Sequence, residues 1–303
     1  MTIALTSRHA LWSTWSFQAF PGIAVVGLFY FVGLARLWRR RGGRTAVRRW
    51  EATAFFGGLL ATAGALVSPI HHAGDQILSA HMLQHLVLIL VAAPLLVLGR
   101  PQLPLLLALP RSWRRRLHAF AARRLVRRTV HLLTTPTAIW ITGVVVLWSW
   151  HLPALYDAAV RNTGLHTLEH FSFLATAFMF WWTVLQPVGS RLAPGHDVLY
   201  VFTAGIAGGA LGALFAFATS PLYPTYVPRA LALGISPLAD QQLAGLVMWI
   251  PSGMVYLAFA SWLLVRWLRA VEVEARRVEG APREGGPPFP VENDPILTGR
   301  FEP

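Results

Sequence analysis

Long apolar runs separated by short polar segments dominate this chain. Seven such runs occur, at residues 18–36, 52–69, 78–99, 134–151, 166–186, 197–219 and 239–266. Most approach or exceed the length of about 20 residues that a helix needs to cross a bilayer. Strand-length alternation of apolar and polar residues, which is typical of membrane β-barrels, is absent from the sequence. The pattern therefore predicts an all-α integral membrane protein, a seven-transmembrane helix bundle.

The polar segments divide the chain into three parts. Residues 1–17 form an outer N-terminal segment, residues 18–271 the seven-helix membrane domain, and residues 272–303 a Pro- and Gly-rich tail that we expect to be disordered and cytoplasmic. Segment 111–130 repeats apolar residues among arginines, which predicts a cytoplasmic amphipathic helix, and a solvated connector with no function beyond topology stays open as the alternative. Positive charge follows the first apolar run instead of preceding it, which is untypical of a cleaved signal peptide.

Charge sets the expected orientation. The chain is 55% hydrophobic and 13% charged, and all 26 basic residues are arginine. Of these, 23 fall on one side, in loops 36–49 and 100–128, at Arg191 and after the last run, while the other side receives Arg8, Arg161 and Arg229. The positive-inside rule then places the N-terminus outside and the C-terminus in the cytoplasm. The net charge of +13 thus reflects topology in a lipid bilayer, and we expect no nucleic-acid partner.

Small residues and a proline modify two of the runs. The sixth run contains four glycines in overlapping small-xxx-small patterns, which predict close packing of another helix: Gly205, Gly208, Gly209 and Gly212. Pro251 should kink the seventh run and leave a backbone carbonyl for a neighbour to satisfy.

Histidines gather at the predicted outer face. Eight of the eleven histidines fall there, namely His9, His71, His72, His81, His85, His151, His166 and His170. Four of them form twin motifs, His81-Met-Leu-Gln-His85 and His166-Thr-Leu-Glu-His170, on two parallel runs. Residues i and i+4 share one helix face, so each pair could hold an ion, or all four could meet. We therefore expect a metal site formed by His81, His85, His151, His166 and His170.

Other interpretations of the histidines stay open. They could bond carbonyls or lipid headgroups, which would leave a scaffold without metal. Facing histidines could also clamp a single haem in a redox protein, although two haems about 5.4 Å apart would collide. The second motif matches the HxxEH pattern of some metalloproteases, with Glu169 as base. Gln84 occupies the matching position of the first motif, which indicates that the geometry needs no base, so we expect no enzyme.

Among metals, the available ligands favour copper. The chain has no cysteine, which excludes disulfides, thiolate ligands and iron–sulfur clusters. Imidazole and thioether are both good copper donors, and thioether favours Cu(I). Met248 is a possible ligand, whereas Met82 should point to a different face from His81. Three polar residues near the outer ends could hold ligand imidazoles by hydrogen bonds or act as ligands: Asp240, Gln241 and, as a further candidate, Asp157.

The same residues carry a family resemblance. The ordered motifs are the first histidine pair followed by Pro94 and Gly99-Arg100-Pro101, Trp148-Ser-Trp-His151-Leu-Pro153, the second pair with Phe180-Trp181-Trp182, Ser220-Pro221-Leu-Tyr223, and Asp240-Gln241-Gln242 with Met248-Trp249-Ile-Pro251. Over residues 55–265 the chain resembles the multi-pass bacterial cytochrome c oxidase assembly factor family, called CtaG in bacilli. This resemblance covers several separated motifs in order and is more specific than any one of them.

The resemblance implies a multi-pass protein of the bacterial plasma (inner) membrane that matures an aa-type terminal oxidase through its copper centres. The implied partners are cytochrome c oxidase subunits, with a copper chaperone as a further candidate. The implied functional set is His81, His85, His151, His166, His170 and Asp240.

Overall fold

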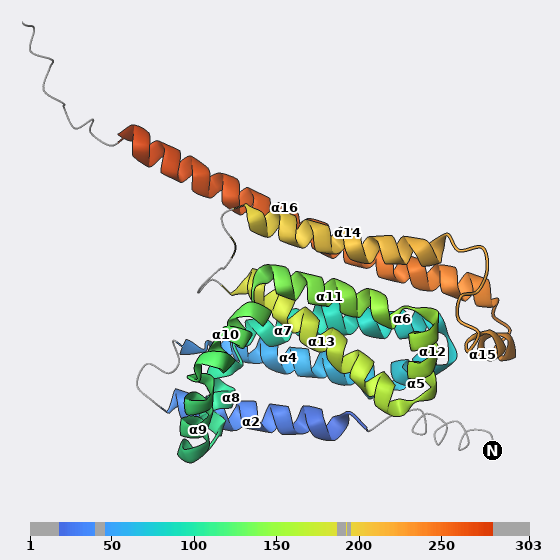
Figure 1. Cartoon of the computed structure of the whole chain (residues 1–303), viewed down its shortest axis with the longest axis horizontal. Coiled ribbons are helices and arrows are strands. Elements are labelled where there is room, and N and C mark those ends of the chain that lie inside the picture. Colours follow the sequence, from blue (N-terminus) through green and yellow to red (C-terminus); the bar gives the residue numbers. More distant parts are fainter. Residues whose placement is uncertain (1–17, 40–45, 187–191, 193–194, 281–303) are drawn as a thin grey trace, which may run out of the picture.

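Every regular element that the structure describes is a helix. The computed structural model describes residues 18–39, 46–186, 192 and 195–280. The helices that correspond to the seven apolar runs are α2 (Phe20–Trp38), α4 (Arg49–Leu66), α6 (Leu78–Val87) with η1 (Leu88–Ala92) and α7 (Ala93–Leu98), α11 (Pro136–Trp150), α13 (Thr163–Leu185), α14 (His196–Ala216) and α16 (Pro237–Gly280). They lie side by side as one elongated bundle (Figure 1), which confirms the all-α membrane fold.

The number of membrane crossings is bounded by length and composition. Five of the described helices are long and apolar enough to cross a membrane individually. The number reaches seven if two bent pairs each count as one span: α4 with α5 (Pro69–Gln76), bent by 41°, and α10 (Arg124–Leu133) with α11, bent by 64°. The expected count of seven is the upper bound, and the expected orientation of the termini stays a prediction.

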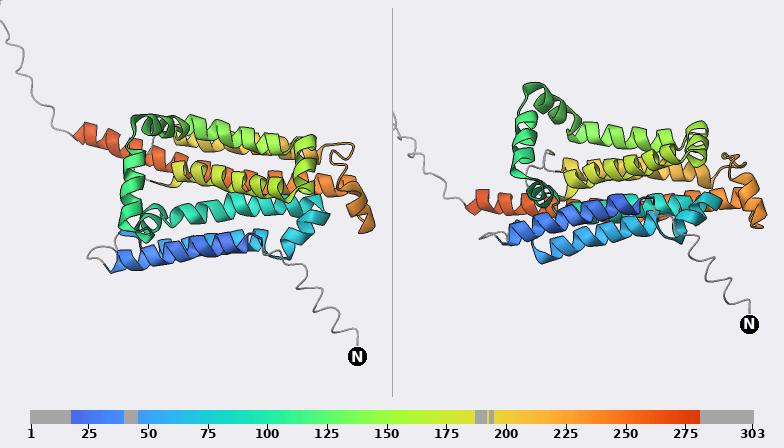
Figure 2. Two further views of the ribbon diagram at one scale, coloured as in Figure 1. Left: turned by 60° about the horizontal axis from the view of Figure 1, so that its bottom comes forward. Right: turned by 90° about the horizontal axis from the view of Figure 1, so that it is seen from below.

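Short helices close the two ends of the bundle. At one end lie α8 (Gln102–Ala108), α9 (Arg111–Ala121) and α10, and at the other lie α5, α12 (Pro153–Arg161) and α15 (Val227–Ala232) (Figures 1 and 2). The expected single amphipathic helix over 111–130 is wrong in detail. Extended backbone at Arg123 (φ −60°, ψ 130°) separates α9 from α10, and neither helix buries a residue.

Prolines and polar caps set several helix starts at both ends of the bundle. Thr135 caps α11 by accepting a hydrogen bond from the Ala138 amide (3.3 Å), and Asn162 caps α13 by accepting one from the Leu165 amide (3.1 Å). Proline occupies the first turn of α5, α11 and α12, where its missing N–H costs no hydrogen bond. The cap at Asn162 places His166 in the first turns of α13.

The third apolar run is not a uniform helix. The amide of Ala93 bonds the carbonyl of Leu88, five residues back, which makes η1 a π-helix. Pro94 has no N–H, so the carbonyl of Ile89 has no donor within its own helix. The indole of Trp181 on α13 supplies one at 2.8 Å. This bond ties the third run to α13.

Helices α14 and α16 pack closely, as the glycine pattern predicts. A Cβ atom added at Gly212 would lie 2.9 Å from the carbonyl oxygen of Gly245, and one added at Gly205 would lie 2.9 Å from the Cβ of Tyr256. Gly208 differs, because a Cβ there would meet only Leu147, at 3.9 Å. The backbones of these two helices therefore approach each other where side chains are missing.

Helix α16 extends past the expected end of the membrane domain. Residues beyond 271 were expected to be disordered, yet α16 continues to Gly280, and Arg276 pairs with Glu272 one turn earlier at 2.5 Å. Pro251 lies inside this helix, and the adjacent Ser252 hydroxyl donates to the carbonyls of Met248 and Trp249. The expected kink at Pro251 stays a prediction. Residues 1–17 and 281–303 lie outside the described part of the chain.

Candidate metal centre

Five histidines meet at the end of the bundle formed by α5, α12 and α15. His81 and His85 come from α6, His166 and His170 from α13, and His151 follows the last turn of α11. The ring centroids of His81 and His166 are 5.1 Å apart, those of His85 and His170 are 5.3 Å apart, and those of His85 and His151 are 5.9 Å apart. The structure thus brings together all five predicted histidines. His9 lies outside the described residues.

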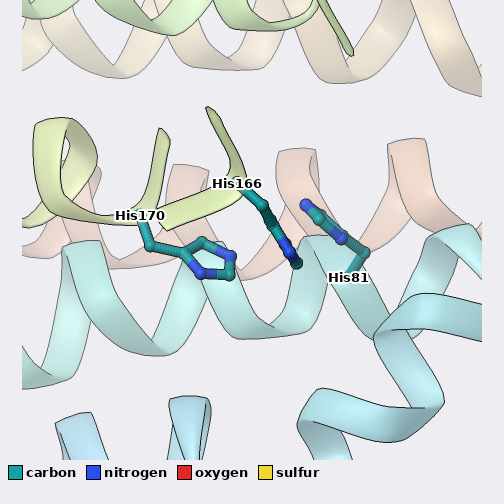
Figure 3. Close-up of side chains that lie close together, drawn as sticks. All are labelled: His81, His166 and His170. Atoms are coloured by element: carbon teal, nitrogen blue, oxygen red, sulfur yellow. The ribbon is translucent and has the colours of Figure 1, made fainter. Parts of the chain in front are cut away.

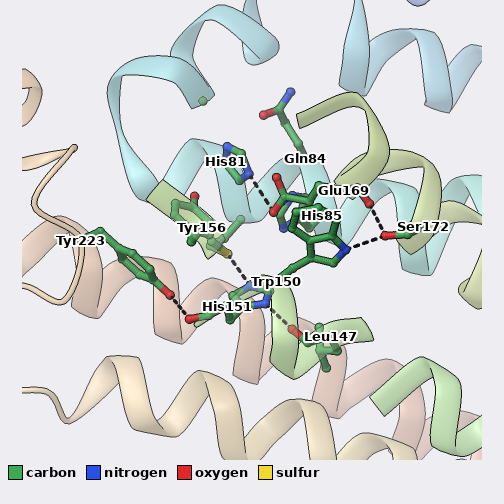
Figure 4. Close-up of polar contacts among 12 residues, drawn as sticks. His81, Gln84, His85, Leu147, Trp150, His151, Tyr156, Glu169, Ser172 and Tyr223 are labelled. Carbon is green, nitrogen blue, oxygen red and sulfur yellow. Dashed lines mark hydrogen bonds and ion pairs between the residues drawn. The ribbon is translucent and has the colours of Figure 1, made fainter. Parts of the chain in front are cut away.

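Three overlapping groups of donor atoms in the described residues have spacings that suit an ion. In the first group, ring nitrogens of His81, His166 and His170 all lie within 4.8 Å of one another, with the three rings side by side between α6 and α13 (Figure 3). In the second, His81 and His85 meet Glu169. The Glu169 Oε1 is 3.8 Å from His81 Nε2 and 3.6 Å from His85 Nε2 (Figure 4). His81 belongs to both of these groups, and the third group, His71, Asp75 and His166, shares His166 with the first.

Several donor atoms of this cluster lack a hydrogen-bond partner. Within the described residues, the Nε2 atoms of four histidines (His81, His85, His166 and His170) and both carboxyl oxygens of Glu169 are buried without a hydrogen-bond partner. Buried polar atoms in proteins are normally bonded, and leaving one unbonded costs about 1–3 kcal/mol. A bound cation would satisfy several of these atoms at once.

The hydrogen bonds around His81 fix which nitrogen is free. The Tyr226 hydroxyl donates to the Gly74 carbonyl (2.7 Å) and lies 3.3 Å from His81 Nδ1. Because its only proton goes to Gly74, the phenol oxygen must accept from His81, which places the imidazole proton on Nδ1. The Nε2 of His81 then carries a lone pair. A bond of this kind at the second ring nitrogen is typical of metal-ligating histidines.

Buried tyrosines line the outer side of the cluster. The Tyr223 hydroxyl donates to the carbonyl of His151 at 2.8 Å, and Tyr156 lies 3.4 Å from the Tyr226 oxygen. Burial raises the pKa of all three phenols above the usual value, so they act as neutral hydrogen-bonding groups. Tyr226 was missed by sequence reasoning, because a lone tyrosine between two runs carries no local signal of its contact with α6.

Asp240 and Gln241 were expected to hydrogen-bond the histidines, but in the described structure they bond backbone amides instead. The Asp240 carboxylate accepts hydrogen bonds from the backbone amides of Leu78 (2.6 Å) and Ser79 (3.2 Å), so it caps the first turn of α6. The Gln241 amide oxygen accepts from the Leu222 amide at 2.6 Å. Asp240 thus positions α6, which carries the first histidine pair, and Gln241 positions the backbone at Leu222.

The two methionines occupy unexpected places. Met248 packs in an apolar cluster that includes Leu211 and Phe215. Met82 was expected to face away from the histidines, but its sulfur lies 3.4 Å from His151 Nε2 and its side chain is fully buried. Asp157, the further candidate, is buried with one carboxyl oxygen unbonded in the described structure.

The middle residues of the twin motifs have different roles. The Gln84 side-chain amide donates to the Ala65 carbonyl (2.8 Å) and lies 3.0 Å from His71 Nδ1, toward α4 and α5. Glu169 instead points between His81 and His85. Gln84 is therefore no guide to the function of Glu169, contrary to the expectation from the sequence.

A cavity of about 1130 Å³ adjoins the cluster. Its polar end is lined by residues that include His71, His166, His170 and Arg229, and its apolar part runs between α2, α4 and α13. The histidines of α13 are thus reachable from a space outside the helix core.

Comparisons with known proteins agree with this architecture. The family described as cytochrome c oxidase caa3 assembly factor matches residues 28–270. Uncharacterized proteins of Mycobacterium bovis and Mycobacterium tuberculosis are each 25% identical over 265 residues, and one of Mycobacterium leprae is 24% identical over 273 residues. These matches cover 85% of this chain and 40% of each relative, so the chain spans about two fifths of their length. No solved structure matches the chain.

Proposed function

Because the chain belongs to the cytochrome c oxidase caa3 assembly factor family, we propose that it binds copper at the histidine cluster and passes it on during assembly of an aa-type oxidase. Copper in this proposal is cargo and not a resident cofactor. The protein's own contribution is to bind and release the ion, and we assign no catalytic step to it.

One observation carries the proposal, namely the unbonded buried nitrogens of four histidines around Glu169. Imidazole is a good copper ligand, and a second hydrogen bond like that from His81 to Tyr226 orients such a ligand. Polar groups at this depth of a membrane bundle are expensive unless they are paired or coordinate an ion. The cavity beside α13 supplies a route by which an ion or a donor group could reach the cluster.

The proposed setting follows from the two ends of the bundle. Arginine-rich α9 and α10 lie at one end of the bundle, and α5, α12 and α15, beside the histidines, lie at the other (Figure 1). If the arginines face the cytoplasm, the histidines open at the outer leaflet of the bacterial inner membrane. There the cluster could exchange copper with cytochrome c oxidase subunits and with a copper chaperone.

Metal analysis of the purified protein tests the proposal. The wild-type chain should retain copper, and a variant with His81, His85, His166 and His170 all changed to Ala should lose nearly all of it. His118→Ala is the matched control, because His118 is exposed on α9 at the opposite end. Equal copper in the wild type and the four-histidine variant would contradict the proposal, as would a Soret band, which would indicate haem instead.

A further inference from the structure

We infer that the copper held by this protein is Cu(I), and that Met82 and His151 form a thioether–imidazole pair that binds it. This inference rests on the proposed function and goes further, because it assigns an oxidation state and a sulfur ligand. Neither follows from the histidine cluster alone.

In the contact between His151 and Met82, neither facing atom carries a hydrogen that it could donate. His151 Nδ1 lies 2.7 Å from the Leu147 carbonyl oxygen, which can only accept, so Nδ1 carries the imidazole proton (Figure 4). In the neutral ring, Nε2 therefore carries a lone pair. That lone pair faces the Met82 sulfur at 3.4 Å, and a thioether has only lone pairs to offer. Two acceptors in contact are best explained by a cation shared between them.

The separation fits simultaneous coordination. Small tetrahedral ions bind imidazole nitrogen at about 2.0 Å and sulfur at about 2.3 Å. With these bond lengths, the 3.4 Å separation closes a nitrogen–metal–sulfur angle of roughly 105°. This value is close to the tetrahedral angle, so the pair can hold one ion without rearrangement.

A third donor lies beside the pair. His85 is buried, both of its ring nitrogens are unbonded within the described structure, and its ring centroid is 5.9 Å from that of His151. Phe173 packs against both imidazoles, at 4.5 Å from His85 and 5.9 Å from His151, and keeps this side of the site apolar. Two imidazoles and one thioether suit Cu(I), which accepts a neutral thioether more readily than Zn(II) or Cu(II) does.

Copper K-edge X-ray absorption on the full-length protein loaded anaerobically with Cu(I) tests the inference. The chain contains five methionines and no cysteine, so a sulfur neighbour at about 2.3 Å can come only from methionine. We expect this sulfur signal in the wild type, its loss in Met82→Leu, and its retention in Met248→Leu. Met248 is the matched control because it belongs to the same buried cluster as Met82.

Affinity provides a second readout. Met82→Leu should bind Cu(I) at least about tenfold more weakly while its affinity for Zn(II) is unchanged. Leucine preserves most of the side-chain volume, and thermal unfolding of the variant checks that it folds. If Met82→Leu does not fold, the unsubstituted protein and Met248→Leu are labelled with selenomethionine instead. A copper–selenium contact should then appear in both labelled proteins.

Failure of the inference differs from failure of the proposed function. Bound Cu(I) with only nitrogen and oxygen neighbours in the wild type, or sulfur retained in Met82→Leu, would overturn the inference and leave copper binding intact. A wild-type protein that binds no copper would overturn both.

Discussion

A single carboxyl group lies between the two histidines of α6. Glu169 is fully buried, and its Oε1 is within 3.8 Å of both His81 Nε2 and His85 Nε2. A carboxylate among imidazoles adds an oxygen donor and negative charge, which suit Zn(II) or Cu(II). The sulfur of Met82 lies on another side of the same cluster, near His151. The site therefore offers different donors to different ions.

Glu169→Gln should weaken binding of divalent ions more than binding of Cu(I). Glutamine keeps the shape of the side chain but removes its charge, so we expect Zn(II) affinity to fall about tenfold or more. Competition titration with a chromophoric chelator measures the change, and the exposed Glu272→Gln on α16 is the control.

The same variant separates a binding protein from a hydrolase. If Glu169 were a general base, Glu169→Gln would keep its metal and still fail to restore oxidase activity in a deletion strain. Our proposal expects Glu169→Gln to retain both its copper and most oxidase assembly, because Glu169 is assigned no role as a base.

The histidine pairs could be predicted from sequence because spacing of four residues places side chains on one helix face whatever surrounds the helix. Met82 could not. It lies about 100° around α6 from His81, and its relevance depends on His151, which another helix brings to that side. Which neighbours surround a buried helix is a tertiary property that local periodicity does not contain.

At the scale of elements, the bond from Trp181 to Ile89 holds α13 against the third run. It supplies the donor that the π-helix and Pro94 remove from the Ile89 carbonyl. The apolar runs could be predicted because hydropathy is a local sum. The π-helix could not, because its unpaired carbonyl is stabilised by an indole that lies far away in the sequence.

Trp181→Phe should destabilise the fold by about 1–3 kcal/mol, since it leaves that carbonyl unbonded in the core. Thermal unfolding in detergent should show a lower Tm. The neighbouring Trp182→Phe serves as the control, and an equal loss in both variants would mean that aromatic volume, and not the hydrogen bond, is what matters.

The close approach of α14 and α16 leads to a second prediction about the packing of helices. Gly212→Ala should cost about 1–3 kcal/mol, because its Cβ would meet the Gly245 backbone on α16. Gly208→Ala, four residues earlier on α14, has room and should be neutral or slightly stabilising. Comparable Tm values for the two variants would count against tight packing at Gly212.

At the scale of the whole molecule, the arginine-rich helices α9 and α10 and the cluster of five histidines occupy opposite ends of the bundle. The absence of cysteine allows each end to be labelled through one introduced thiol. Ala122→Cys, between α9 and α10, and Leu233→Cys, after α15, both replace exposed residues.

In intact cells, we expect a membrane-impermeant maleimide to label Leu233→Cys at once and Ala122→Cys only after permeabilisation, as the positive-inside rule requires. Labelling in the reverse order would place the histidine cluster on the cytoplasmic side and remove the proposed outer setting for copper exchange.

Helix α16 gives the molecule a mechanical property. Its 44 residues correspond to about 66 Å at 1.5 Å per residue, roughly twice the about 30 Å of a bilayer core. One end projects beyond the other helices (Figure 1), and near the other end Asp240 grips the first turn of α6. If a partner bound the projecting end and displaced α16, the displacement would be transmitted along one helix to Asp240, and from Asp240 to α6 and its histidine pair. Helix α16 thus connects the two ends of the protein through one continuous element.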